Sequence, residues 1–175
     1  MNRLIGSAAL VGWLLAAAAH AASLAGIDVA ERIPAVWALH VGIFPVFAPV
    51  IFSARRLFGP KPSLSQLRAI LPAWVMAAGV TVSVYAMVNF MLFLAAAQGG
   101  KAASVNGRYV LQNHGEVIRE LSDAEYTALR ANELRGFSGH WLLFYFVPFA
   151  YFLFAKPGVE KDREGVQPPS LPGAA

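Results

Sequence analysis

The four histidines, His20, His40, His114 and His140, are the residues of this sequence best suited to chemistry. The sequence has no cysteine, which excludes disulfides, thiolate catalysis and cysteine-ligated metals or clusters. Imidazole nitrogens do bind haem iron and several other metal ions. The spacing of the four histidines matches no metal-binding motif of fixed length, so their role depends on the elements that place them.

Four apolar stretches dominate the sequence, at residues 4–25, 33–54, 72–97 and 137–155. Each is long enough for a transmembrane helix, which needs about 20 residues. Charged residues make up only 14% of the chain, whereas soluble domains carry about 25%. We therefore expect an all-α membrane protein, a four-transmembrane-helix bundle with a small ββα extracytoplasmic insert between helices 3 and 4.

The link between the second and third stretches holds Arg55, Arg56, Lys61 and Arg68 and no acidic residue. Short loops rich in Lys and Arg stay in the cytoplasm. The link predicts a protein of a bacterial-type plasma membrane with both termini in the cytoplasm. Basic residues interleaved with aromatic ones, as in nucleic-acid-binding surfaces, do not occur outside the link, so nucleic-acid binding is not expected.

Residues 98–136 form the polar insert, which by this topology lies outside the membrane. Residues 108–112 and 116–121 have the pattern of two strands joined by a tight turn. Ser122 and Glu125 match a capping box, which predicts a short helix that Gly136 ends. We expect this ββα unit to rest on the membrane domain as a lid.

The topology places all four histidines on the outer side of the membrane. His20, His40 and His140 lie roughly 4 to 9 Å below the outer ends of their helices, at 1.5 Å per residue, and His114 lies in the hairpin of the insert. The first two helices are expected to be antiparallel neighbours, so His20 and His40 would face each other. They are candidate ligands for haem b, and His140 with His114 are candidate ligands for a metal ion.

The small residues of the first helix also concern the hypothesis that His20 and His40 bind haem b. Ala8, Gly12 and Ala16 recur every four residues and form a ridge that His20 continues, so His20 should point at a neighbouring helix. Gly12 and Gly42 would leave room for a haem ring.

The first apolar stretch also has an alternative interpretation as a signal peptide, cleaved after the small-x-small trio Ala19-His20-Ala21. The stretch is longer than the usual apolar core of a signal peptide, which has about 7–15 residues. We favour an uncleaved first span, because of this length and because the ridge of small residues suits close helix packing. Cleavage would remove His20 and weaken the haem hypothesis.

Polar residues recur inside the third stretch at Thr81, Tyr85 and Asn89, and this spacing puts them on one helix face. We expect them to be buried and to bond across a helix interface, with a ligand or quinone contact as the alternative. Ser138 and His140 do not form a nucleophile–base pair, because residues two apart on a helix do not face each other.

No catalytic residue is assigned from the sequence. The main hypothesis is a non-catalytic scaffold, accessory subunit or binding module that contacts the lipid bilayer. It would bind another membrane protein through the insert or the aromatic last helix. The alternative is a redox-associated protein that carries haem b or a metal ion at the outer histidines. The Pro- and Gly-rich residues 156–175 are predicted to be a disordered cytoplasmic tail.

Overall fold

The computed structural model describes residues 2–61 and 63–155, so the predicted tail at residues 156–175 lies outside the described part of the chain. The elements follow one another as α1 (Asn2–Leu24), α2 (Val29–Arg32), the 3-10 helix η1 (Pro34–Trp37), α3 (Ala38–Phe58), α4 (Leu64–Ile70), α5 (Ala73–Ala96), β1 (Lys101–Val105), β2 (Arg108–Asn113), β3 (Glu116–Glu120) and α6 (Asp123–Phe154).

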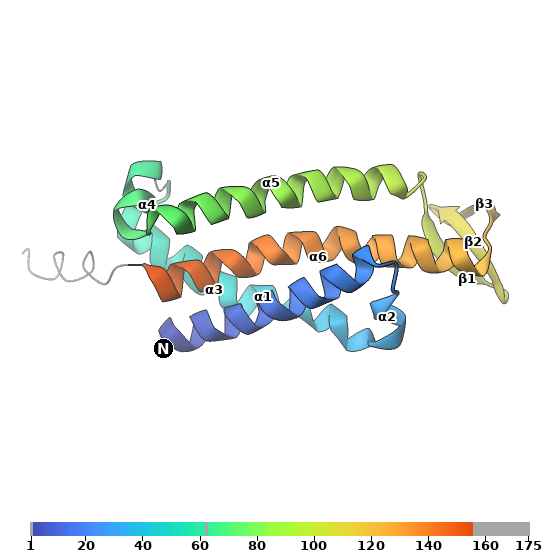
Figure 1. Ribbon diagram of the computed structural model, residues 1–175, viewed down its shortest axis with the longest axis horizontal. Helices are drawn as coiled ribbons and strands as arrows, with labels where there is room; N and C mark the ends of the chain where they lie inside the picture. The colour runs from blue at the N-terminus through green and yellow to red at the C-terminus, as the bar shows by residue number, and fades with distance from the viewer. Residues whose placement is uncertain (1, 62, 156–175) are drawn as a thin grey trace, which may run out of the picture.

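Four long helices run along the molecule, with a small sheet at one end and α4 at the other (Figure 1). These helices, α1, α3 together with η1, α5 and α6, are long and apolar enough to cross a membrane. The predicted four-helix architecture is confirmed at this level. Helix α6 is the central element, because it packs against α1, α3 and α5.

Tyr145 of α6 shows how the bundle closes around this central helix. A Cβ atom added to Gly12 of α1 would lie 2.3 Å from the Tyr145 ring, and one added to Gly42 of α3 would lie 2.5 Å from its hydroxyl oxygen. The hydroxyl group donates a hydrogen bond to the Leu39 carbonyl at 2.7 Å. The room at Gly12 and Gly42 is therefore filled by a tyrosine ring, and the expectation that it would receive a haem is wrong.

The ridge on α1 also differs in detail from the prediction. Ala9, Gly12, Ala16 and His20 are buried, whereas Ala8 is exposed. These buried positions follow steps of three or four residues, as expected for one face of a straight helix with 3.6 residues per turn.

The insert contains a three-stranded antiparallel sheet in the order β1-β2-β3, not the predicted pair of strands. Lys101 in β1 pairs with Gln112 in β2, and Asn113 pairs with Glu116 in β3. Strand β1 was not predicted because its sequence, Lys-Ala-Ala-Ser-Val, contains mostly residues of low strand propensity. Hydrogen bonding to β2 makes this segment a strand despite its low intrinsic strand propensity.

The last helix begins at the predicted capping box but does not end at Gly136. The Ser122 hydroxyl accepts from the Glu125 amide and starts a helix that continues without interruption to Phe154. Gly136 lies inside this helix, where an added Cβ would meet the Phe93 ring of α5 at 2.6 Å. Gly136 therefore allows α5 and α6 to pack closely, and it does not terminate α6.

An ion pair joins the link between α1 and α3 to α6. Asp28 caps α2 by accepting from the Glu31 amide at 3.0 Å, and its second carboxylate oxygen lies 3.4 Å from Nε of Arg130. The Asp28 side chain is only 3% exposed. Buried charges require such partners, so this pair fixes the connection between the first two long helices against α6.

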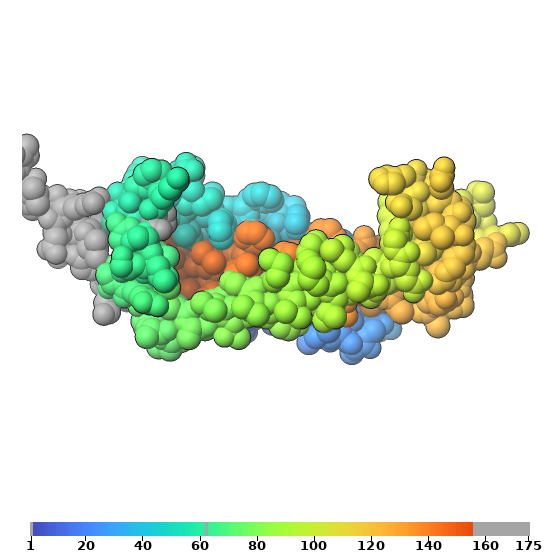
Figure 2. Space-filling view, turned by 90° about the horizontal axis from the view of Figure 1, so that it is seen from above, coloured from blue at the N-terminus to red at the C-terminus, as the bar shows by residue number. Residues whose placement is uncertain are grey.

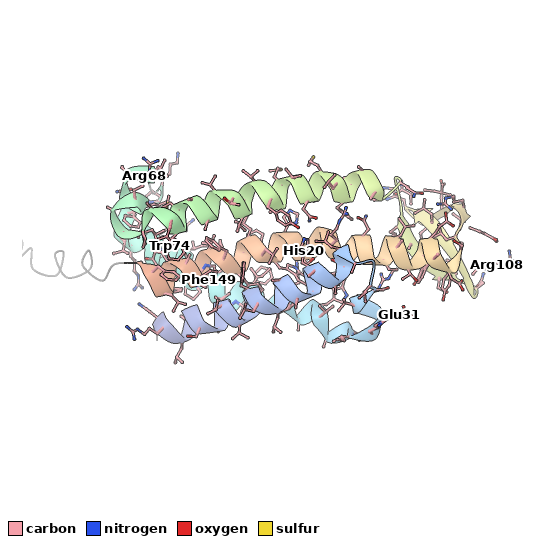
Figure 3. All side chains as sticks on the ribbon, in the orientation of Figure 1. His20, Glu31, Arg68, Trp74, Arg108 and Phe149 are labelled. Carbon is pink, nitrogen blue, oxygen red and sulfur yellow. The ribbon has the colours of Figure 1, made fainter. Side chains whose placement is uncertain are left out.

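The charged residues divide between the two ends of the bundle. Figure 3 labels Arg68 at the end formed by α4, where Arg3, Arg55, Arg56 and Lys61 also lie, and Arg108 at the sheet end. Every Asp and Glu of the described residues lies in the turn at α2, in the sheet or in the first three turns of α6. The α4 end of the described chain is therefore purely basic.

Candidate functional site

A groove of about 510 Å³ runs between α3 and α5, and α6 forms its floor. Figure 2 shows α6 in orange within a hollow between α5 in green and α3 in cyan. The groove exists because α3 and α5 both pack on α6 but barely touch each other in the described chain. Its lining consists of His40, Ile43, Phe44, Phe47, Ala48, Ile51, Phe90, Phe93, Gly136, Phe137, His140, Trp141 and Phe144.

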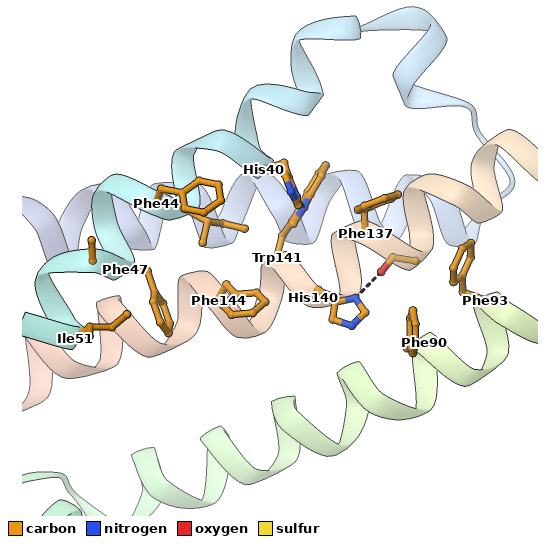
Figure 4. A pocket seen from close by; sticks show the side chains of 13 residues that line it. His40, Phe44, Phe47, Ile51, Phe90, Phe93, Phe137, His140, Trp141 and Phe144 are labelled. Carbon is orange, nitrogen blue, oxygen red and sulfur yellow. Dashed lines mark hydrogen bonds between the residues drawn. The ribbon is translucent and has the colours of Figure 1, made fainter. Parts of the chain in front are cut away.

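Two imidazoles, those of His40 and His140, are the polar side chains of this aromatic groove, together with the indole N–H of Trp141 (Figure 4). Both lie toward the sheet end, since His40 is in the first turn of α3 and His140 is in the middle of α6. Phe44, Phe47 and Ile51 line the groove farther toward the α4 end. Phe93 and Phe137 line it on the other side of the imidazoles, so the two rings lie between apolar stretches of the groove.

The hydrogen-bond partner of His40 determines which of its two ring nitrogens carries the hydrogen. The Trp141 indole donates to Nδ1 of His40 at 3.0 Å. Because an indole N–H can only donate, Nδ1 of His40 is unprotonated and the neutral ring carries its hydrogen on Nε2. Trp141 is 1% exposed and packs edge-on against Trp37 with ring centroids 5.8 Å apart, which fixes the donor in place. His40 therefore offers a hydrogen-bond donor.

His140 has the opposite tautomer. Its Nδ1 lies 2.9 Å from the Gly136 carbonyl oxygen, one helical turn earlier (Figure 4). A carbonyl oxygen can only accept, so Nδ1 carries the hydrogen and Nε2 has a free lone pair. The Phe90 ring packs edge-on against the imidazole with centroids 5.0 Å apart. The two imidazoles therefore have opposite tautomers, while the exposed lining of the groove is almost entirely apolar.

His20 lies outside this groove and does not face His40 as predicted. Its Nδ1 is 2.8 Å from the Ser138 hydroxyl, and its Nε2 is 2.5 Å from the Tyr85 hydroxyl. Ser138 donates its own hydrogen to the Arg135 carbonyl at 3.3 Å, so it accepts from Nδ1–H and Tyr85 donates to Nε2. This chain of hydrogen bonds joins α5, α1 and α6 and uses both nitrogens of His20.

This geometry does not fit the predicted haem or metal sites. Haem ligation by two imidazoles needs two unprotonated nitrogens that face one iron atom. Both nitrogens of His20 are bonded to hydroxyl groups, and the unbonded nitrogen of His40 carries a hydrogen. His114 lies in the β2–β3 turn at φ 49°, far along the chain from the groove. Within residues 2–61 and 63–155, no three His, Asp or Glu side chains are grouped as a metal site would need.

The polar residues of α5 have three different environments. Asn89 is 3% exposed and donates to the Arg135 carbonyl of α6 at 3.0 Å, as expected for a bond across a helix interface. Tyr85 bonds to His20 of another helix as expected, but 40% of the residue is exposed, so its predicted burial is wrong. Thr81 is exposed and bonds to the Ala77 carbonyl of its own helix, so its predicted burial is wrong.

The sequence reasoning missed the groove and its aromatic walls. It treated the aromatic residues of the last stretch as a property of that helix alone, and it did not connect Phe90 or Phe93 with His140. The missing signal was Gly139, which lets α5 approach: a Cβ there would lie 2.2 Å from Nδ2 of Asn89. This contact fixes the rotation of α5 against α6, so that Phe90 lies beside His140.

Comparison of the chain with protein-family models, with curated proteins and with solved structures finds no match.

Proposed function

We propose that the chain spans a bacterial-type plasma membrane four times and is a non-catalytic binding module that takes up a lipid-soluble molecule in the groove between α3 and α5. The groove itself carries the proposal. Ligand sites of about 300–1,000 Å³ lined mainly by apolar and aromatic side chains are typical of small-molecule binding. A groove between two spanning helices is accessible from the lipid phase.

In the proposed orientation the α4 end lies in the cytoplasm and the sheet lies outside. The purely basic composition of the α4 end supports this, since Lys and Arg are enriched on the cytoplasmic side. The same proposal keeps α1 in the mature protein. Ala16, Ala19 and His20 are buried, and His20 bonds to two other helices, so cleavage after residue 21 would remove packing that the bundle uses.

A protein partner is proposed to bind at the sheet and not along α6. Helix α6 packs against α1, α3 and α5 and is open mainly at the groove, whereas β3 is an edge strand with Val117 and Ile118 each more than half exposed. The redox alternative is less well supported, because among the three histidines of the helices only His140 offers an imidazole lone pair.

The experiment is photolabelling in lipid nanodiscs with an alkyl diazirine, followed by mass-spectrometric mapping of the labelled peptides. We expect labels to concentrate on the groove-facing peptides of α3, α5 and α6. Ala48→Phe fills the groove and should reduce this labelling severalfold. Val84→Phe adds a ring to an exposed position of α5 outside the groove lining and should leave it unchanged. Equal labelling of all lipid-facing surfaces in both variants would contradict the proposal.

A further inference from the structure

We infer that the α4 end of the chain binds an anionic phospholipid of the cytoplasmic leaflet. The phosphate group lies on Arg68, and one acyl chain lies in a second groove, between α4 and α5. This site is separate from the groove between α3 and α5. The inference rests on the proposed insertion of the chain into a membrane with the α4 end in the cytoplasm, and not on what the first groove binds.

The second groove lies where the chain turns from α4 into α5. Leu71 is extended, with φ −103° and ψ 140°, as expected for a residue that precedes a proline, here Pro72. Helix α4 therefore ends before α5 begins and lies at the end of the bundle (Figure 1). Ile70 is 2% exposed and packs with Val50 of α3 and Tyr151 of α6. This packing fixes the corner between α4 and α5.

The walls of this groove, which has a volume of about 510 Å³, are mostly apolar. Leu64 and Leu71 line it on the α4 side, and Met76 and Val80 line it on the α5 side. Ala77 lies between the last two in the lining, and its short side chain leaves the surface of α5 hollow there. Leu64 is 55% exposed and Val80 is 62% exposed, so the groove is open to the surroundings of the protein.

Arg68 is the one polar side chain of this lining, four residues after Leu64 and on the same face of α4. The side chain is exposed and makes no hydrogen bond or ion pair with another described residue. Because the α4 end of the described chain holds no carboxylate, the counter-ion of Arg68 must come from another molecule. A guanidinium group matches the geometry of a phosphate, which it binds through two parallel N–H bonds.

The charge and the groove follow one another in the direction in which a phospholipid lies in a membrane. Trp74, in the first turn of α5, is 58% exposed, and Figure 3 labels it at the same end of the molecule as Arg68. Exposed tryptophans mark the level of the lipid headgroups. From Ala73 to Val80 the groove follows α5 for about 10 Å toward the middle of the membrane, at 1.5 Å per residue. An acyl chain below a phosphate on Arg68 therefore enters the groove.

An anionic phospholipid matches both features of the site, whereas other ligand classes match only one. A soluble anion would leave the apolar walls empty. A neutral lipid would leave Arg68 without a counter-ion, and the ammonium group of a zwitterionic lipid would offset the charge of its phosphate. Anionic lipids are present in the cytoplasmic leaflet, and basic pockets between spanning helices on that side bind their headgroups.

The test uses phosphatidylglycerol with a diazirine in one acyl chain, added in trace amounts to phosphatidylcholine nanodiscs that contain the full chain. We expect the labels to concentrate on residues 64–80. Unlabelled phosphatidylglycerol should compete about fivefold better than phosphatidylethanolamine with the same chains, the factor that one basic residue contributes near an anionic lipid surface. Free glycerol phosphate should not compete, and competition by it would overturn the role of the acyl chain.

Charge variants link this preference to Arg68. Arg68→Gln removes the charge, so the advantage of phosphatidylglycerol should fall to within about twofold. Arg68→Lys keeps the charge without the planar fork and should retain part of the advantage. Arg55→Gln is the matched control, because Arg55 is exposed at the same end of the bundle but does not line the groove. This control should leave the preference unchanged.

A filling variant tests the groove itself. Ala77→Phe places a ring between the walls and should reduce the labelling of residues 64–80 severalfold. Met87→Phe adds a ring at a position of α5 that is 62% exposed and lies outside this groove, and it should leave the labelling unchanged. Ala77 is itself exposed, so the variant removes no buried contact. The preference of the unaltered protein for phosphatidylglycerol remains decisive if a variant fails to fold.

The outcomes separate this site from the groove between α3 and α5. Equal losses in Arg68→Gln and Arg55→Gln would overturn the inference, because the general charge of this end would then be sufficient. Equal competition by the two phospholipids would also overturn it and leave Arg68 to an acidic segment of a protein partner. Ala48→Phe should not change the labelling of residues 64–80, and Ala77→Phe should not change that of the first groove, so either proposal can fail without the other.

Discussion

The Tyr145 ring of α6 occupies the space left by the absent side chain of Gly12 in α1, where an added Cβ would lie 2.3 Å from Cε1 of the ring. The same tyrosine reaches Gly42 of α3 with its hydroxyl group, which donates to the Leu39 carbonyl. One side chain thus determines the spacing of three helices. Contacts of this kind, between small residues and one large ring, allow close helix packing inside a membrane.

The first prediction separates the ring from the hydroxyl group of Tyr145. Gly12→Ala and Gly42→Ala should each lower the stability by about 1–3 kcal/mol, the usual cost of overpacking. In a Tyr145→Phe background, Gly42→Ala should become nearly neutral because its clash is with the hydroxyl oxygen. Gly12→Ala should remain destabilising there, because its clash is with ring carbons. Thermal unfolding in detergent measures each effect.

Each double variant is compared with Tyr145→Phe alone, since that change removes the bond to Leu39 and itself costs about 1 kcal/mol. Equal rescue of both glycine variants by Tyr145→Phe would contradict the placement of the ring between α1 and α3.

These glycines also show what the sequence can and cannot predict. The hydropathy of the sequence was enough to predict four membrane-spanning helices, because the length and apolar composition of a segment do not depend on the rest of the fold. Gly12 and Gly42 were expected to leave room for a haem ring, but the Tyr145 ring fills that space. The sequence could not identify this ring, because its position depends on how α6 is rotated against its neighbours.

The histidines illustrate the same limit. Periodicity indicated that His20 points at another helix, which is confirmed, but its partners are Ser138 and Tyr85 and not His40. A residue's position on its own helix face is local information, whereas pairing across helices depends on crossing angles and depth. The continuous course of α6 through Gly136 was missed for a related reason, since a glycine that ends a helix and one that admits a neighbour look alike in sequence.

The second prediction concerns Asn89, which bonds across the α5–α6 interface. Asn89→Ala removes the donor to the Arg135 carbonyl and should cost about 0.6–1.7 kcal/mol, from the average to the largest value for hydrogen bonds between membrane helices. Thr81→Ala is the matched control on the same helix, because its hydroxyl bonds to Ala77 of α5 itself. The control should change stability by less than about 0.5 kcal/mol. Equal losses in both variants would show that the interhelical bond contributes nothing specific.

The third prediction tests the orientation across the membrane. The chain contains no cysteine, so single substitutions give labelling without background. Ser104→Cys in β1 and Ser65→Cys in α4 are both exposed positions. A membrane-impermeant maleimide should label Ser104→Cys in intact cells and label Ser65→Cys only after the membrane is permeabilised. The reverse pattern would invert the proposed topology.

A charge variant shows whether the basic link causes this orientation. Replacing Arg55, Arg56, Lys61 and Arg68 with Gln should produce a mixed population in which Ser65→Cys is partly labelled in intact cells. Replacing Arg108 and Lys101, at the sheet end, should leave the labelling unchanged, because it only increases the excess of Lys and Arg at the α4 end.

The fourth prediction concerns haem. Two unprotonated imidazole nitrogens facing one iron are needed for bis-histidine ligation, and the hydrogen bonds of His20 and His40 leave no such pair. Protein purified in mild detergent, and the same protein titrated with haem b, should therefore lack the visible absorption spectrum of a six-coordinate bis-histidine haem. Any binding through a single imidazole should be lost in His140→Ala and retained in His20→Ala. A bis-histidine spectrum abolished by His40→Ala would contradict the tautomer assigned from Trp141.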